Sequence, residues 1–403
     1  MSKTEQLARP ESVDALQDII LEANADALAI DVAGGGSKAL IGDPGPGDVA
    51  LSTRGFGAVV DYDPAELVLT AGAGVSLAEI EALLDASGQM LAFEPMDYAP
   101  LLGAPTGQAT LGGVLAANVS GPRRLTAGAA RDHFIGLAAV SGRGDMFKAG
   151  GRVVKNVTGY DLPKLLGGSW GTLAVLTEVS VKVMPKPRSS ATLVTHGLSD
   201  ETAAQVMSGC LGAPLCVSAA AHFPAGLAAN LPGLEGASGA VTLLRLEGVA
   251  PSIASSVHGA YDLAGWEQQL GEAETAALWR AIRDVAPFAG GEDVVWRISA
   301  PPADGWRIVA ALSSLGGRAF YDWAGGLIWL SLPPANDAHA PAVRRAVAVF
   351  SGHATLIRAS PLVRAAVAVF QPEAPALAAL TARVKAAFDP AGVLNPGRRL
   401  AGA

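Results

Sequence analysis

Apolar and polar positions alternate along the first hundred residues with two different periods. Residues 11–25 (ESVDALQDIILEANA) carry apolar side chains at helical spacing, and Ser12 is a suitable N-cap. The short apolar run ALAIDVA at 27–33 follows and predicts a strand. The same order returns within 65–95, where a strand ending at TAGAG precedes a helix capped by Ser76. These periods indicate a mixed α and β fold.

The second half of the chain has a coarser pattern. The segment MPKPRSS at 184–190 combines prolines and charges, and we take it as a boundary between domains. Beyond it, strands and helices joined by short links predict an antiparallel α+β layer, with a hairpin turning at Gly325–Gly326. The tail begins with one amphipathic helix and ends in turns. The expected parts are residues 1–187, 188–370 and 371–403.

Composition removes several classes of function. Of the 403 residues, 50% are hydrophobic and 16% are charged, which is ample for a large core. The formal charge of -8 argues against a nucleic-acid partner, because such binding depends on a basic face. The start lacks the apolar region of a signal peptide, and no apolar run is long enough for a membrane span. Cys210 and Cys216 supply neither a disulfide framework nor four cluster thiolates, so we expect a cytosolic protein.

The sequence IDVAGGGSKAL at 30–40 places three glycines directly after a predicted strand. Such a turn presents several backbone N–H groups to one point, which suits an anion such as a diphosphate. Lys38 adds a positive charge or is a solvated loop lysine, and an ordinary flexible turn also explains the glycines. The chain has no Walker A motif, and PGPG at 44–47 follows too soon for a G-x-G-x-x-G turn into a helix.

Two further segments are rich in glycine. Residues 105–137 contain Gly112–Gly113, Asn118 and Gly121 in a stretch too polar for an ordinary core helix. Adjacent glycines permit close packing of a large planar or phosphorylated ligand, and an asparagine side chain both donates and accepts hydrogen bonds. Residues 153–179 (VVKNVTGYDLPKLLGGSWGTLAVLTEV) add another glycine cluster ahead of a β-rich run.

Together, the three segments resemble the FAD-binding domain of the vanillyl-alcohol oxidase and p-cresol methylhydroxylase (PCMH) family. The final FDPAGVLNPGR at 388–398 resembles the C-terminal signature of FAD-linked 2-hydroxyacid oxidases. More narrowly, RVVKNVTGYDLPKLLGGSWGTL at 152–173 resembles the FAD-binding subunits of bacterial glycolate oxidases. The resemblance implies an α+β fold: a two-part FAD-binding domain of the PCMH type, an antiparallel cap, and a C-terminal helix that returns to the first domain. It covers the cap only weakly.

The resemblance also implies a set of FAD-binding residues. The diphosphate loop corresponds to Gly34, Gly35, Gly36, Ser37 and Lys38, and the second FAD segment to Thr110, Gly112, Gly113, Asn118, Ser120 and Gly121. Adenine-side contacts correspond to Gly171 and Val175, and the returning C-terminal segment to Asn395 and Arg398. Some relatives hold FAD covalently through a His or Cys, whereas this loop offers Ser37. We therefore expect dissociable, non-covalent FAD.

The catalytic residues are not assigned by the sequence. Relatives that oxidise D-2-hydroxy acids with a bound metal carry a His-rich motif. Neither His339 nor His353 has a second histidine or a carboxylate at ligand spacing, so we expect no metal site. Arg297, Trp323, His353 and Arg358 are candidate substrate contacts. For Trp323 we favour packing in the hairpin, and for the two arginines a position at the rim.

Three candidates in the first domain have competing interpretations. Arg131–Asp132 orients the flavin or forms an ordinary ion pair, which we favour. His133 is expected to be a hydrogen-bonded structural histidine. Tyr160 and Asp161 face the flavin ring, or Asp161 caps the next helix.

We expect an FAD-binding subunit of a glycolate oxidase complex that oxidises a small 2-hydroxy acid. The resemblance implies two partners, a catalytic flavoprotein subunit and an iron–sulfur subunit, which can hold the chain at the inner face of the membrane. A stand-alone FAD-dependent dehydrogenase of a hydroxy acid or alcohol is the first alternative. A structural or electron-relay flavoprotein subunit is the second.

Overall fold

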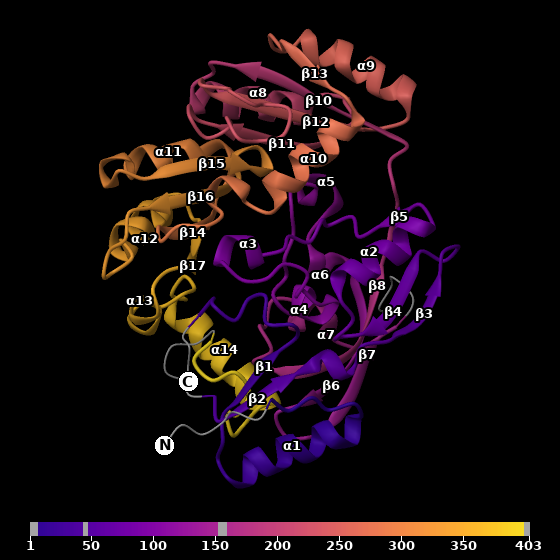
Figure 1. The fold of residues 1–403 in the computed structure, drawn as a ribbon. Helices are drawn as coiled ribbons and strands as arrows, with labels where there is room; N and C mark the ends of the chain where they lie inside the picture. The colour runs from indigo at the N-terminus through magenta and orange to yellow at the C-terminus, as the bar shows by residue number, and fades with distance from the viewer. Residues whose placement is uncertain (1–6, 43–46, 152–158, 399–403) are drawn as a thin grey trace.

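Two β-sheets of unequal size organise the chain, and helices pack against both (Figure 1). The computed structural model describes residues 7–42, 47–151 and 159–398. The chain begins with α1 (Val13–Ala25), followed by the parallel strands β1 (Ile30–Ala33) and β2 (Val49–Ser52). Ser12 caps α1 by accepting a hydrogen bond from the Ala15 N–H at 3.2 Å, as predicted.

A five-stranded antiparallel sheet forms the rest of the N-terminal half. Its strand order is β3-β4-β8-β6-β7. The strands are β3 (Val59–Asp63), β4 (Val68–Gly72), β6 (Phe134–Ser141), β7 (Met146–Gly150) and β8 (Ala174–Lys182). The helices are α2 (Leu77–Ala86), α3 (Ala99–Leu102), α4 (Leu111–Ala116), α5 (Arg124–Ala127), α6 (Ala130–His133) and α7 (Leu162–Leu166). Ser76 caps α2, as predicted.

An eight-stranded antiparallel sheet follows, and we call this sheet with its helices the cap. Its order is β13-β10-β12-β11-β15-β16-β14-β17. The strands are β10 (Ser189–His196), β11 (Val217–Phe223), β12 (Val241–Gly248), β13 (Gln268–Leu270), β14 (Val294–Ser299), β15 (Arg318–Asp322), β16 (Leu327–Leu332) and β17 (His353–Arg358). The helices are α8 (Asp200–Gly212), α9 (Ala250–Tyr261), α10 (Glu272–Arg283), α11 (Gly305–Ala311) and α12 (Ala340–Val349).

The C-terminal segment returns to the N-terminal half, as the resemblance implies. After α13 (Pro361–Ala366), helix α14 (Pro375–Phe388) runs down beside β1 (Figure 1). Leu394 then forms a parallel bridge with Ile30, so the chain end extends the first pair of strands. The buried Asp389 carboxylate holds this turn by accepting the Leu394 N–H at 2.8 Å and the Lys385 ammonium at 2.5 Å.

Buried apolar side chains connect the two halves of the molecule. One continuous cluster contains Leu69 and Phe134 of the first sheet together with Phe223 and Phe320 of the cap sheet. A short strand pair, β5 (Gln89–Met90) with β9 (Met184–Pro185), lies where the chain passes from one half to the other. In the part of the chain described here, no helix combines the length and apolar character that crossing a membrane requires.

The predicted hairpin is present, and its turn contains Gly325–Gly326 but is two residues longer than the glycine pair. The turn begins at Trp323 rather than at the glycine pair, because both Trp323 (φ 51°) and Ala324 (φ 54°) adopt the left-handed conformation. The Asp322 carboxylate accepts the Trp323 N–H at 2.7 Å, and the indole Nε1 donates to the Gly121 carbonyl at 2.9 Å. Gly325 also has a positive φ, of 99°, so the distant contact of Trp323 adds two left-handed residues to the turn that the glycine pair predicts.

Candidate functional site

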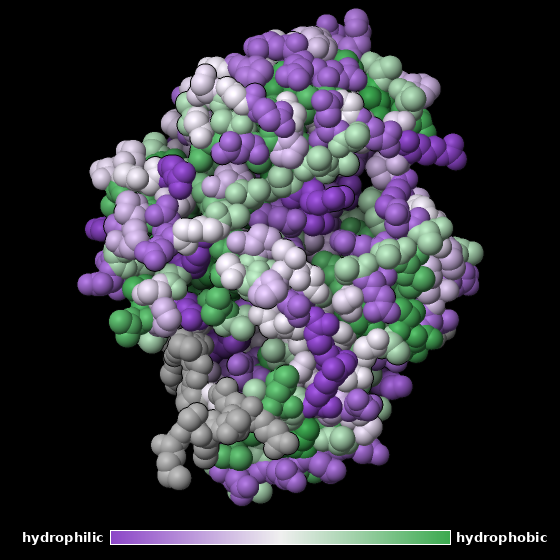
Figure 2. Space-filling view, viewed as in Figure 1, coloured by the Kyte–Doolittle hydropathy of each residue, from purple (hydrophilic) through white to green (hydrophobic). Residues whose placement is uncertain are grey.

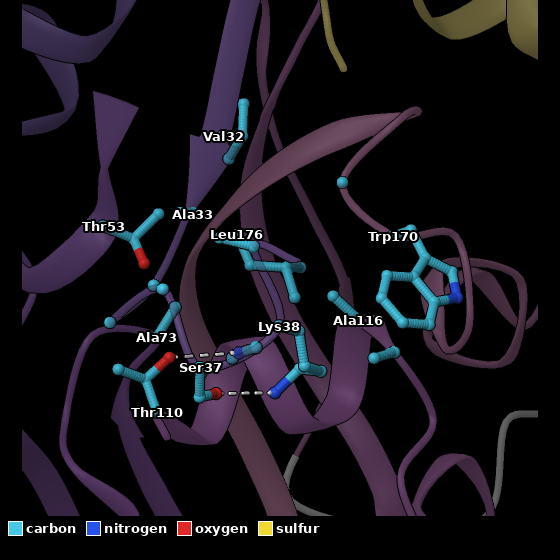
Figure 3. A pocket seen from close by; sticks show the side chains of 18 of the residues that line it. Val32, Ala33, Ser37, Lys38, Thr53, Ala73, Thr110, Ala116, Trp170 and Leu176 are labelled. Carbon is cyan, nitrogen blue, oxygen red and sulfur yellow. Dashed lines mark hydrogen bonds between the residues drawn. The ribbon is translucent and has the colours of Figure 1, made fainter. Parts of the chain in front are cut away.

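A pocket lies at the end of β1, where the predicted diphosphate loop meets the start of α4 and the turn before β8 (Figure 3). Ten of the residues implied by the resemblance line it: Gly34, Gly35, Gly36, Ser37, Lys38, Thr110, Gly112, Gly113, Gly171 and Arg398. They come from four separate stretches of the chain. The fold thus brings the segments together that the sequence analysis singled out independently.

The loop after β1 presents backbone donors to this pocket. The N–H groups of residues 35–38 donate no hydrogen bond to any residue that the structure describes. Backbone N–H groups in folded proteins are nearly always paired, so a row of free donors at a pocket indicates a ligand with several acceptor atoms. A diphosphate fits this arrangement, because its oxygens accept hydrogen bonds from consecutive amides.

The glycines of the loop serve two different purposes. A Cβ on Gly34 would lie 2.1 Å from Thr110 Oγ1, and one on Gly35 would lie 1.8 Å from the Gln108 carbonyl oxygen. These two glycines therefore allow the loop to pack against the segment before α4. A Cβ on Gly36 would meet no atom within 4 Å, but its φ of 80° favours glycine. Gly34 and Gly35 thus make room for other parts of the protein, and only Gly36 faces open space.

Thr110 organises the opposite wall of the pocket. Its Oγ1 accepts the Gly113 N–H at 3.3 Å and caps α4 (Figure 3). A Cβ on Gly112 would lie 2.6 Å from the Ala73 Cβ, so this glycine sets the distance between α4 and the strand end that follows β4. A Cβ on Gly113, in contrast, would have only the Thr110 hydroxyl and the Lys38 amine within 4 Å, so this side of Gly113 is open to the pocket.

Lys38 is the basic group of the loop. Its Nζ donates to Ser37 Oγ at 3.2 Å and points into the pocket (Figure 3). Burial lowers the pKa of Lys38 to about 8, and the carboxylate of Asp97 partly opposes this shift. An amine with that pKa is mostly protonated at neutral pH and gains a counter-charge when an anion enters the pocket. Loop amides and Lys38 together fit the diphosphate of FAD.

Five of the implied residues do not line the pocket: Asn118, Ser120, Gly121, Val175 and Asn395. Asn118 has a φ of 50° and accepts the Arg131 N–H, and buried Ser120 accepts the Ala130 N–H. A Cβ on Gly121 would lie 2.4 Å from the Glu94 carbonyl oxygen. These residues shape the segment after α4, and their direct contact with FAD remains a prediction.

Asn395 connects three stretches of backbone. Its side-chain oxygen accepts the Val32 N–H at 2.7 Å, and its Nδ2 donates to the Trp170 carbonyl at 2.8 Å. Its own N–H donates to the Ile30 carbonyl at 2.9 Å. The geometry gives Asn395 the role of holding β1 and the turn at 170 in place beside the pocket. Arg398, by contrast, lines the pocket and forms an ion pair with Asp31 at 3.3 Å.

Several residues that were not predicted as site residues also line the pocket, including Thr53, Ala116 and Trp170. Trp170 has a φ of 58° and places its ring at the side of the pocket, edge-on to Phe370. Trp170 lies inside the GGSWGT motif at 167–172, so its position next to Gly171 could have indicated that it lines the pocket. Thr53 follows β2 and carried no motif.

The remaining candidates of the N-terminal half have structural roles. His133 is buried, with Nε2 2.8 Å from the Ala127 carbonyl oxygen. Arg131 and Asp132 form the expected ion pair at 4.0 Å, and both are about half exposed. Asp161 caps α7 by accepting the Lys164 N–H, whereas Tyr160 is 91% exposed. Residues 152–158 of the narrower motif and 44–46 of the PGPG sequence lie outside the described residues.

The structure separates the candidate residues of the cap. Arg297 and His353 lie on the neighbouring strands β14 and β17, and Arg297 stacks over the Trp323 ring at 5.1 Å. Arg358 lies elsewhere, since its guanidinium donates to the carbonyls of Asp293, Leu101, Phe288 and Gly290. A residue that the sequence analysis did not consider, Arg124 of α5, also stacks over Trp323 at 4.4 Å.

Comparisons with known proteins show the family of this chain. Residues 4–150 match the FAD binding domain family. The chain is 34% identical over 388 residues to the glycolate oxidase subunit GlcE of Escherichia coli, covering 96% of this chain and 97% of that protein. It is 30% identical over 215 residues to the glycolate oxidase subunit GlcD of Bacillus subtilis, covering 53% of this chain and 44% of that protein.

Solved structures show the same fold. That of p-cresol methylhydroxylase has a TM-score of 0.71 at 16% identity, covering 97% of this chain and 88% of its own. The 4-ethylphenol oxidase of Gulosibacter chungangensis has a TM-score of 0.70 at 17% identity, covering 98% and 90%. The predicted FAD-binding fold with an antiparallel cap is therefore confirmed. The chain belongs to the FAD-linked oxidoreductase family that includes the glycolate oxidase subunit GlcE.

Proposed function

We propose that this chain is the FAD-binding subunit of a glycolate oxidase that converts glycolate to glyoxylate together with partner subunits. The observation that carries the proposal is the similarity to the glycolate oxidase subunit GlcE along its whole length, cap included. We propose a catalytic flavoprotein and an iron–sulfur protein as the partners. The second similarity, to the subunit GlcD, fits an assembly built from related flavoprotein chains.

The residues of this chain would bind and orient the cofactor. The N–H groups of residues 35–38 and the ammonium of Lys38 would hold the diphosphate, and Trp170 would border the flavin or the adenine. Among the described residues that line the pocket there is no His or Cys, so binding would be non-covalent. FAD, when bound, supplies the capacity to accept a hydride from a hydroxy acid. The protein contributes placement and the exclusion of water.

Two experiments test the proposal. The first is to titrate the purified full chain with FAD and then precipitate it in acid, where the yellow colour should stay in solution. The second is to purify tagged chain from native extract and identify its partners by mass spectrometry. We expect a second flavoprotein and an iron–sulfur protein, and glycolate-dependent dye reduction by that assembly. A chain that stays monomeric in extract and is bleached by glycolate alone would instead be a stand-alone dehydrogenase.

A further inference from the structure

Trp323 joins the cap to the N-terminal half. It lies at the turn between β15 and β16, is 6% exposed, and donates its indole N–H to the carbonyl of Gly121 at 2.9 Å. The left-handed backbone at Trp323 and Ala324 is strained for residues other than glycine. Such strain persists only where the surroundings fix it. This tryptophan therefore has a defined position next to the segment that follows α4.

Two guanidinium groups stack over this indole. Arg124 comes from α5 of the N-terminal half and lies 4.4 Å from the ring centre, and Arg297 comes from β14 of the cap at 5.1 Å. Among the described residues, neither guanidinium has a hydrogen-bond or ion-pair partner. Stacking on tryptophan fixes an arginine while leaving its N–H donors available in the plane. Both residues are partly exposed to solvent.

The neighbouring residue Arg123 shows that the absence of a partner is specific to Arg124. Arg123 donates to both carboxylate oxygens of Glu247, at 2.9 and 2.8 Å, and lies 3.1 Å from Glu94. The start of α5 thus contains Arg123, which is paired with carboxylates, and Arg124, which is not. The carboxylates of Glu94 and Glu247 lie in this region, but among the described residues no carboxylate is within hydrogen-bond distance of Arg124 or Arg297.

The surroundings of the two arginines are mostly cationic or neutral. Burial and the positive charges of Arg297 and Arg131 lower the pKa of Arg124, and the carboxylate of Asp132 partly opposes them. Burial and the charges of Arg297 and Arg124 also lower the pKa of His353. Asp322 precedes Trp323 in the chain, and burial raises its pKa to about 7, although the positive charges of Arg245 and Arg297 partly oppose this shift.

We propose that Arg124 and Arg297 form a binding site for the carboxylate of a small 2-hydroxy or 2-oxo acid. A carboxylate accepts two parallel hydrogen bonds from one guanidinium and would relieve the repulsion between the two charges. Because one arginine belongs to each half, the bound acid would also connect the cap to the N-terminal half. The choice of ligand rests on the proposed function, whereas the anion site rests on the geometry.

Oxalate tests this site, because it resembles both glycolate and glyoxylate and is not consumed. Calorimetry on the full chain, with and without bound FAD, should detect oxalate binding. Arg124→Gln and Arg297→Gln should each weaken that binding about ten-fold or more, because each removes a charged donor. Arg318→Gln is the matched control, since Arg318 also stacks on an aromatic ring, that of Phe288 at 5.7 Å, but pairs with Asp293 at 3.3 Å. It should leave oxalate binding unchanged.

Each outcome decides the inference. Unchanged binding in both variants, or no oxalate binding by wild-type protein that holds FAD, overturns the site. Sulfate binding as tightly as oxalate overturns the assignment to carboxylates. If a Gln variant loses FAD or melts early, the corresponding Lys variant keeps the charge and should retain part of the affinity. Oxalate binding by a chain that captures no partners would refute the proposed function and leave this site standing.

Discussion

The pKa of Lys38 predicts that FAD binding depends on pH. Burial brings this pKa to about 8, while the Asp97 carboxylate opposes the shift, so the amine is charged below about pH 8 and neutral above it. The diphosphate prefers the charged amine, and binding therefore takes up a proton when the free amine is neutral. It follows that the affinity for FAD is constant at lower pH and falls as the pH rises through 8.

The size of the effect follows from the contact. A hydrogen bond to a charged group is worth roughly 1.5–3 kcal/mol, which corresponds to about ten-fold to one-hundred-fold in affinity. That energy would raise the pKa of Lys38 by about one to two units in the bound state. The dissociation constant should therefore increase between about pH 8 and pH 10, by at most that factor.

Fluorescence titration of FAD at constant ionic strength measures this dependence. Lys38→Gln should bind FAD about as weakly at pH 7 as wild-type protein does at pH 10, with little further change. Lys38→Arg is the control, because a guanidinium stays charged throughout this range and should remove the pH dependence while keeping much of the affinity. Equal pH profiles for wild-type protein and Lys38→Gln would refute the reasoning.

Two other variants test the packing that supports the site, and a third serves as a control. Gly35→Ala places a methyl group against the Gln108 carbonyl, so it should lower the free energy of unfolding by about 1–3 kcal/mol and remove most FAD binding. Gly209→Ala is the control, because this helical position is open, and it should leave stability in chemical denaturation unchanged or raise it. Asp389→Asn leaves a buried ammonium without its counter-charge and should cost about 3 kcal/mol, with faster proteolysis of the chain end. A wild-type proteolysis rate would contradict that role.

Glu247 adds a prediction about acid: although burial alone would raise its pKa, hydrogen bonds from Arg123 and the charge of Arg245 lower it to about 2. Since the folded-state value lies below the ordinary one, the stabilisation is complete above about pH 4.5 and is lost as the pH falls toward 2. Glu247→Gln should thus be less stable at pH 7, by up to about 3 kcal/mol, and the gap should close in acid. A constant gap would contradict the argument.

Elements and loops with local determinants could be predicted from the sequence. Ser12 and Ser76 cap helices that their own neighbours define, and the loop at 34–38 lies at the end of a strand that its apolar run predicts. The glycine motifs also indicated which distant segments share one pocket, because they match a known order of FAD-binding segments. The reasons for individual glycines were not predictable, since Gly34 accommodates the side chain of Thr110 and Gly35 the backbone of Gln108, both more than seventy positions away.

Contacts between the two halves had no local signal. Arg124 and Arg297 carry nothing in their flanking sequences that distinguishes them from solvated arginines, and only the fold brings both to one indole. The left-handed Trp323 was equally unpredictable, because a Gly-Gly pair two residues later is the stronger turn signal. Periodicity reports which face of an element is buried, and it does not report which charged side chains remain without partners.

Arg123 and Arg124 show how adjacent residues of one type come to differ in function. Arg123 belongs to a network in which Glu94 also binds Arg245 of the cap through two hydrogen bonds of 2.8 Å. Such a buried network adds little net stability, because desolvation offsets most of the attraction, but it fixes the relative position of the groups it joins. The network thus sets where α5 begins relative to the cap sheet. Arg124, one residue later, is thereby held against Trp323 with its donors free, which is the condition that a carboxylate site requires.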